Sequence, residues 1–264
     1  LRRRGGPGGG DLAVGDPAAA LARAFAALDG RLAASRQLAW LDADEDGADG
    51  VTGLAPSIVR KAGTTATVVY MRGGDCWVAC VGDSRCVLGS APPSGGSAGA
   101  GNGLVARDLS TEHKPDDPEE RKRLTSAGGV VTEAGASGKP PARIFTANRS
   151  HGLAMSRAIG DLTMRKVGVL PEPTVRHVEI ASNDRLLCVA SDGIWEFIPS
   201  QEACDIAARH ANDATAACEA LVREAQRRWA DNEKNYRDDI TCTVVRLPLL
   251  ASGGAGAAAR ALEA

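Results

Sequence analysis

Apolar residues in this chain form short runs that turn-forming residues separate. The clearest run covers residues 186–190, where five apolar or small side chains predict one buried strand that Ser191-Asp192-Gly193 ends. Residues 66–71 and 76–81 predict two more strands, joined by a glycine-containing turn. The remaining predicted strands are at residues 86–88, 104–109 and 240–247.

Helices are predicted where a capping residue precedes apolar spacings of three and four. Asp16-Pro17 begins the first helix, near residues 17–37. Asp117 begins the second, with Glu120 at capping-box spacing and Gly128-Gly129 at its end.

Two helices are predicted later in the chain. A short one begins near Ser200, and Asp213 caps a longer one. Between the helical regions, residues 132–150 have a loop-like pattern, and the two prolines within residues 168–175 favour an extended edge.

Strand groups that alternate with helical pairs indicate the α/β class with an α+β layered arrangement, in which helices cover antiparallel sheets. The length of 264 residues suits one large domain with a substantial core. We expect this domain at residues 16–248, a flexible glycine-rich lead at 1–15 and a flexible tail at 249–264.

Composition excludes several kinds of partner. Lys and Arg number 31 against 33 Asp and Glu, so no strong charge favours nucleic acid or an anionic membrane surface. No apolar stretch approaches the roughly 18 residues of a membrane span. Seven cysteines without a CxxC pair indicate reduced thiols, from which we expect an intracellular protein, cytoplasmic or nuclear.

Carboxylates at strand ends are the candidate chemistry. Asp192 follows a buried strand, where it is either a metal ligand or part of a polar Asp-Gly turn. Asp238 precedes the last strand, so antiparallel pairing of the two strands would bring both carboxylates to one sheet edge. Asp83 also ends its strand and could join them from a second sheet. Carboxylates without His or Cys favour Mg²⁺ or Mn²⁺, ions suited to phosphoryl chemistry.

A second acidic run, DADEDGADG at residues 42–50, imitates the start of an EF-hand calcium loop. The twelfth position of such a loop requires a bidentate Glu, and Gly53 stands there. We therefore interpret the run as an exposed acidic loop.

Several motifs in order resemble the metal-dependent type 2C (PPM) protein serine/threonine phosphatases. They are AGTTATVV at residues 62–69, CVGDSRCVL at 80–88, TEHKP at 111–115 with AGGVV at 127–131, GLAMSRAIGD at 152–161, VASDGIWEFI at 189–198 and RDDITCTVV at 237–245. The resemblance covers roughly residues 60–247, and several motifs in register are far more specific than any one alone.

This resemblance implies a sandwich of two antiparallel sheets flanked by helices, with two metal ions in a cleft at one edge. It implies that Asp192 and Asp238 are metal ligands, and that Asp83 and Glu196 match positions that hold a third, weaker metal in some members. Two positions depart from the family pattern: Asp239 stands where Asn is usual, and Glu196 replaces a commoner Asp.

A third departure concerns the upstream part of the family's site. Family members carry an Asp-Gly-His-Gly stretch before GTTA, with the metal-bridging Asp and the proposed general acid His, and further upstream a phosphate-binding arginine. None of the Asp-Gly pairs here is followed by His. The first predicted helix resembles the one that follows this stretch, so we expect the chain to begin after it and assign no catalytic residue within this chain.

Other polar residues have structural and functional alternatives. His113 is expected to be a hydrogen-bonding turn residue, and Asp161 a structural one. Arg157 could hold phosphate or form an internal ion pair, for which Asp161 is the candidate partner. We expect Thr64 and Thr65 to start a strand.

The stretch at residues 132–150, with Arg143 and Arg149, lies where the family carries a variable flap. The alternative is a solvated loop, and the sequence does not choose between them.

The sequence thus predicts a protein phosphatase that uses Mg²⁺ or Mn²⁺ to drive water onto phosphoserine or phosphothreonine. Its expected partner is a phosphoprotein substrate, with no nucleic acid or membrane partner, and the expected state is a monomer. The alternatives are a catalytically silent, phosphatase-like binding module and an incomplete gene model of an active enzyme.

Overall fold

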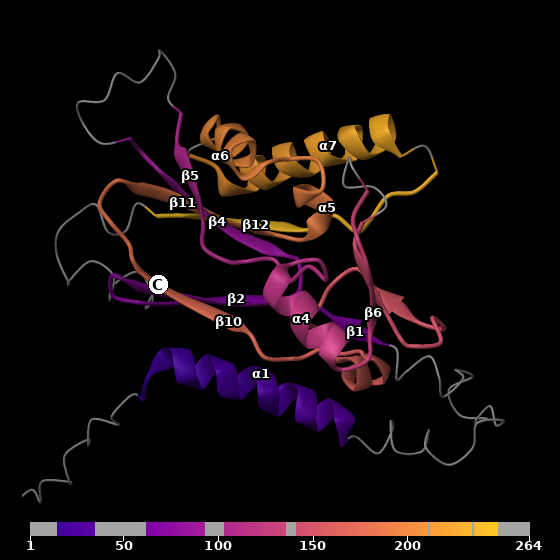
Figure 1. The fold of residues 1–264 in the computed structure, drawn as a ribbon. Coiled ribbons are helices and arrows are strands. Elements are labelled where there is room, and N and C mark those ends of the chain that lie inside the picture. The colour runs from indigo at the N-terminus through magenta and orange to yellow at the C-terminus, as the bar shows by residue number, and fades with distance from the viewer. Residues whose placement is uncertain are drawn as a thin grey trace, which may run out of the picture.

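A computed structural model describes residues 15–34, 62–92, 103–135, 141–210, 212–233 and 235–247 (Figure 1). The acidic run at residues 42–50, the predicted tail and all but the last residue of the predicted lead lie outside the described residues.

The larger sheet has the strand predicted at residues 186–190 as one of its two inner strands. Its order is β12 (Cys242–Arg246), β11 (Asp184–Ala190), β4 (Arg85–Ser90) and β5 (Val105–Asp108), and every pair is antiparallel. The predicted strand at residues 186–190 is therefore flanked on both sides, as its apolar run requires.

A three-stranded antiparallel sheet packs against this one. Its order is β10 (Thr174–Glu179), β3 (Asp75–Val81) and β2 (Ala66–Arg72). Cys76 and Val78 of β3 share a buried cluster with Leu88 and Leu187 of the larger sheet. The two sheets therefore form the predicted sandwich. The extended edge predicted at residues 168–175 is displaced, because β10 begins only at Thr174, after both prolines.

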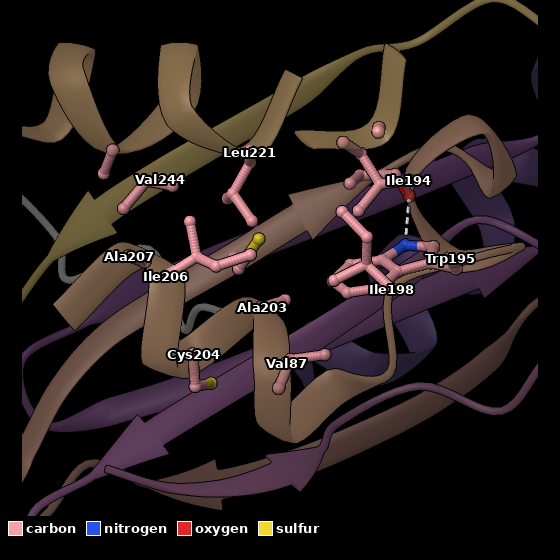
Figure 2. Packing of buried hydrophobic residues seen from close by; sticks show 14 of the residues in the cluster. Val87, Ile194, Trp195, Ile198, Ala203, Cys204, Ile206, Ala207, Leu221 and Val244 are labelled. Atoms are coloured by element: carbon pink, nitrogen blue, oxygen red, sulfur yellow. Dashed lines mark hydrogen bonds between the residues drawn. The ribbon is translucent and has the colours of Figure 1, made fainter. Parts of the chain in front are cut away.

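Helices cover the outer faces of both sheets (Figure 1). The helix α1 (Pro17–Ala33) inserts Phe25 against Ala79 and Val81 on the other face of β3. The helices α6 (Ser200–Ala208) and α7 (Ala214–Asn232) cover the larger sheet, where Leu221 and Val244 pack together with Ile194 of the short helix α5 (Asp192–Trp195) (Figure 2). No helix in the described ranges is both long and apolar enough to cross a membrane.

Several short elements complete the fold. The strands β1 (Gly63–Thr64) and β9 (Ile159–Gly160) pair, and the 3-10 helix η1 (Leu162–Val167) follows. A small sheet contains β6 (Val130–Thr132), β7 (Arg143–Phe145) and β8 (Gly152–Leu153). The stretch predicted as a loop at residues 132–150 therefore contributes a strand.

The predicted helix caps are present. The Asp16, Asp117 and Asp213 carboxylates each accept hydrogen bonds from the first backbone N–H groups of α1, α4 (Pro118–Ser126) and α7. The predicted capping box at Asp117 and Glu120 is wrong in its second half, because the Asp117 N–H donates to the Lys114 carbonyl instead.

Glu120 forms a buried ion network rather than a cap. The residue is 5% exposed, and its carboxylate accepts hydrogen bonds from Arg123 at 2.8 Å, Arg157 at 2.5 Å and the Ser156 hydroxyl. Burial opposes its ionisation, but the hydrogen bonds from Arg123, Arg157 and Ser156 prevail and hold the pKa of Glu120 well below its usual range. The internal ion pair predicted for Arg157 is thus present, with Glu120 instead of Asp161.

We expect Glu120→Ala to lower the free energy of unfolding by about 3 kcal/mol, because the two arginines would lose their shared counter-charge in a buried site. Urea unfolding followed by tryptophan fluorescence measures this loss. The matched control is Glu119→Ala, at the exposed neighbouring position of α4, which should cost at most about 0.5 kcal/mol. Equal losses in the two variants would contradict a structural role for the network.

Candidate active site

Strand pairing brings three predicted ligands to one sheet edge. Ala190, the last residue of β11, pairs with Arg85 at the start of β4 and with Cys242 at the start of β12. Asp192 follows Ala190, Asp83 precedes Arg85, and Asp238 lies shortly before Cys242. The predicted convergence of Asp192 and Asp238 on one edge is confirmed. We call Asp83, Asp192 and Asp238 the acid cluster.

Burial and mutual repulsion both act on the acid cluster. Burial, followed by the negative charges of Asp83 and Asp238, raises the pKa of Asp192 to about 7, while the Lys114 ammonium and the Gly193 N–H act in the opposite direction. A cation placed among these carboxylates would relieve this repulsion.

Lys114 supplies a cation that the sequence analysis did not single out. Its ammonium donates a 2.8 Å hydrogen bond to Asp83 Oδ2 and lies 3.9 Å from Glu112 Oε2. The Asp83 side chain is only 3% exposed, whereas that of Lys114 is 34% exposed. Lys114 lies within the TEHKP motif, but its sequence position does not reveal an Asp83 partner.

Glu196 is linked to Asp192 of the acid cluster through its backbone. It follows α5, where its N–H donates a 2.8 Å bond to the Asp192 carbonyl, and the residue is exposed. Its role as a metal ligand stays a prediction, as do the metal-ligand roles of the acid cluster.

The donor chemistry fits a hard divalent ion, because carboxylate oxygens are its preferred ligands and their repulsion favours a cation. The Lys114 ammonium against Asp83 shows that this site accommodates positive charge. Within the described residues, however, no three His, Cys, Asp or Glu side chains are grouped closely enough to hold an ion by themselves.

Ser191 connects the end of β11 to the segment that precedes β12. Its hydroxyl donates to the Asp239 carbonyl at 3.0 Å and accepts from the Thr241 N–H at 3.1 Å. Its own N–H donates to the Thr241 carbonyl at 3.1 Å. Ser191 therefore fastens the segment that carries Asp238 to the strand end that carries Asp192.

Gly193 permits the same close approach. A Cβ atom at this position would lie 2.4 Å from the Asp239 carbonyl oxygen. The Gly193 carbonyl also accepts a 2.7 Å bond from the Trp229 indole, and the Trp195 indole donates to the Ala190 carbonyl at 2.8 Å. These contacts fix α5, and with it Asp192, against α7 and β11.

Arg85 links the turn after Asp83 to α5, another contact that sequence patterns did not identify. Its guanidinium donates to Glu112 Oε1 at 2.9 Å and to Ser200 Oγ at 2.7 Å, and lies 5.1 Å from the Trp195 ring centroid. A planar guanidinium can make these contacts together, so it holds the two sides of the site in register.

His113 fixes the turn that presents Asp83. Its ring Nδ1 accepts a 3.1 Å hydrogen bond from the Gly82 N–H, and its backbone N–H donates to the Gly82 carbonyl at 2.9 Å. Burial, with a smaller contribution from Arg157, lowers the pKa of His113 to about 4. His113 is thus the hydrogen-bonded residue that the sequence predicted, and it is neutral.

The other polar residues considered from the sequence lie outside the acid cluster. Asp161 is buried in a left-handed conformation (φ 48°) against Gly63, and burial, partly offset by Arg165, raises its pKa to about 6. Thr64 belongs to β1, and the Thr65 hydroxyl bonds Ser84 at 2.8 Å. Arg143, on β7, and Arg149 are exposed.

The depressed pKa of His113 makes stability depend on pH. Its folded pKa of about 4 lies below the ordinary value of 6.5, so its contribution is full above about pH 6.5 and is lost as the pH falls toward 4. We expect this loss to reach about 2 kcal/mol between about pH 8 and pH 5.

Urea unfolding of wild type and His113→Gln at both pH values isolates this contribution, since glutamine can accept the Gly82 bond but does not titrate. The drop in unfolding free energy on acidification should be about 2 kcal/mol smaller in the variant. His177→Gln, at an exposed position on β10, is the matched control and should keep most of the wild-type drop. Identical pH profiles for wild type and His113→Gln would contradict this assignment.

For Gly193→Ala we expect a loss of about 2 kcal/mol in unfolding free energy, because the new methyl group would collide with the Asp239 carbonyl. Hydrogen exchange at the Thr241 amide should accelerate as the segment at 238–241 moves away. Gly74→Ala is the control, since a Cβ there meets no atom within 4 Å. Equal stability of the two variants would show that the close approach is unimportant.

Comparisons with known proteins agree with the fold and show the family. The family model described as "Protein phosphatase 2C" matches residues 18–233. Probable protein phosphatase 2C 64 of Oryza sativa subsp. japonica is 35% identical over 71% of this chain and 42% of its own length. Probable protein phosphatase 2C 35 of Arabidopsis thaliana is 34% identical over 72% of this chain and 57% of its own length.

The chain thus spans about half the length of these curated relatives. A solved serine-threonine phosphatase 2C from Toxoplasma gondii shares the fold, with a TM-score of 0.68 and 24% identity over 87% of this chain and 66% of that chain. Since the family model matches most of the sequence, the chain belongs to the protein phosphatase 2C family.

Proposed function

We propose that this chain is part of a metal-dependent protein phosphatase that hydrolyses phosphoserine and phosphothreonine in phosphoproteins. The observation that carries the proposal is the acid cluster, in which strand pairing brings three carboxylates to one sheet edge in a chain of the protein phosphatase 2C family. Burial, with smaller contributions from the charges of Asp83 and Asp238, raises the pKa of Asp192 there to about 7.

In this proposal Asp192 and Asp238 would hold Mg²⁺ or Mn²⁺, while Asp83 and Glu196 would hold a further, weaker ion. Such ions, when bound, supply activation of water and neutralise phosphate oxygens. The chain's own residues set the geometry. Ser191 fastens the segment that carries Asp238 to the strand end that carries Asp192, and Arg85 holds the turn after Asp83 against Trp195.

We assign no general acid among the described residues. The geometry at His113 supports this choice, because Nδ1 already accepts the Gly82 N–H and the residue is only 2% exposed. His113 therefore stabilises the Asp83 turn and does not exchange protons with a substrate.

We also propose an intracellular location. The seven cysteines are all free thiols, and five of them are buried. Burial raises the pKa of the Cys76 thiol to about 11 and that of Cys204 to about 12. Such unpaired, protonated thiols suit a reducing compartment.

The test is Mn²⁺-dependent hydrolysis of p-nitrophenyl phosphate and of a phosphothreonine peptide by the full-length protein. Asp192→Asn should lower kcat by about a hundredfold or more, because the cluster loses its central negative charge. Asp231→Asn, on the exposed face of α7, should leave activity unchanged. A verified full-length protein without activity in Mn²⁺ or Mg²⁺ would favour the silent binding module instead.

A further inference from the structure

The Lys114 ammonium is held against the acid cluster by the fold around it. Lys114 follows His113, whose ring and backbone are both bonded to Gly82, so the Lys114 backbone is fixed beside the turn that carries Asp83. Its carbonyl also accepts the Asp117 N–H at the start of α4. The 2.8 Å bond from Lys114 to Asp83 is therefore a feature of the fold and not a chance surface contact.

This ammonium neutralises a carboxylate that would otherwise be buried without a counter-charge. Asp83 is 3% exposed at its side chain, and Lys114 Nζ is the cation that contacts it among the described residues. The Lys114 charge also opposes the rise in the pKa of Asp192. Lys114 thus compensates the negative charge of both Asp83 and Asp192.

From this arrangement we propose that Lys114 is a built-in cation that competes with a divalent metal ion for Asp83. An ion bound to an Asp83 oxygen would lie within a few ångströms of the ammonium, where like charges repel strongly in a partly buried site. The ammonium must therefore leave before the ion binds Asp83. This inference rests on the proposed function, since it concerns the metal affinity of the same site.

The neighbouring arginine shows why lysine suits this role. Arg85 is held by Glu112, Ser200 and the Trp195 ring together, so it cannot leave readily. Lys114 is held at its head group by Asp83, with Glu112 more distant at 3.9 Å, and its side chain is 34% exposed. A flexible aliphatic stem lets this ammonium swing into solvent and return.

The proposal predicts two opposite effects of Lys114→Met. Without metal, the variant should be less stable than wild type, because Asp83 loses its counter-charge. With Mn²⁺, the variant should bind the Asp83-dependent ion about tenfold more tightly, because no ammonium has to be displaced. A merely structural lysine would produce the first effect and not the second.

The experiment is calorimetric titration of Mn²⁺ into the full-length protein, with thermal unfolding in EDTA and in Mn²⁺ as a second readout. Lys114→Met and Lys114→Gln are compared with wild type, after circular dichroism has shown that each is folded. Lys122→Met, at an exposed position on α4, is the matched control and should leave both readouts unchanged. Asp83→Asn should remove the affected binding event, alone and combined with Lys114→Met.

Unchanged or weaker Mn²⁺ binding in both folded Lys114 variants would overturn the proposal, and so would an absence of binding in wild type and variants alike. Failure of the proposed function has a different signature. In that case Mn²⁺ binding would respond to Lys114 as described, while the full-length protein would hydrolyse neither phosphate ester.

Discussion

Antiparallel pairing of β11 with both β4 and β12 is the constraint on which the site depends. Ala190 lies between Arg85 and Cys242 in the pairing register, so the segments that carry Asp83, Asp192 and Asp238 must meet at one edge. A register slip of one residue would exchange the two faces of β11 and displace the helix start that carries Asp192. The apolar run of β11 prevents such a slip, because Leu187 must enter the core between the sheets while Leu186 and Cys188 pack under the helices.

The crowding of carboxylates has a cost, which neighbouring contacts offset. Burial, together with repulsion by Asp83 and Asp238, raises the pKa of Asp192 to about 7, so the charged form of Asp192 is disfavoured. Lys114 supplies a positive charge beside Asp83. Ser191 holds the Asp238 segment close by hydrogen bonding, and Gly193 allows that approach because it has no side chain. The geometry is thus maintained against the repulsion among these carboxylates.

A second buried network supports the loops beneath this edge. Glu120 connects α4 to Arg157 and Ser156, and the Ser156 N–H in turn donates to the carbonyl of His113. His113 then fixes the turn that presents Asp83. These pairings matter because an unpaired buried polar group costs more than a net hydrogen bond contributes.

The sequence by itself determined the local structure and the outline of the site. Caps at Asp16, Asp117 and Asp213 and the apolar run of β11 were predictable, because neighbouring residues and spacing control them. Only the tertiary structure decided the partners of the polar side chains. Lys114 meets Asp83 across 31 positions, and Glu120 turns from its expected cap to Arg157 across 37. Such pairs depend on which loops the packed sheets bring together, and spacing along the chain carries no record of that.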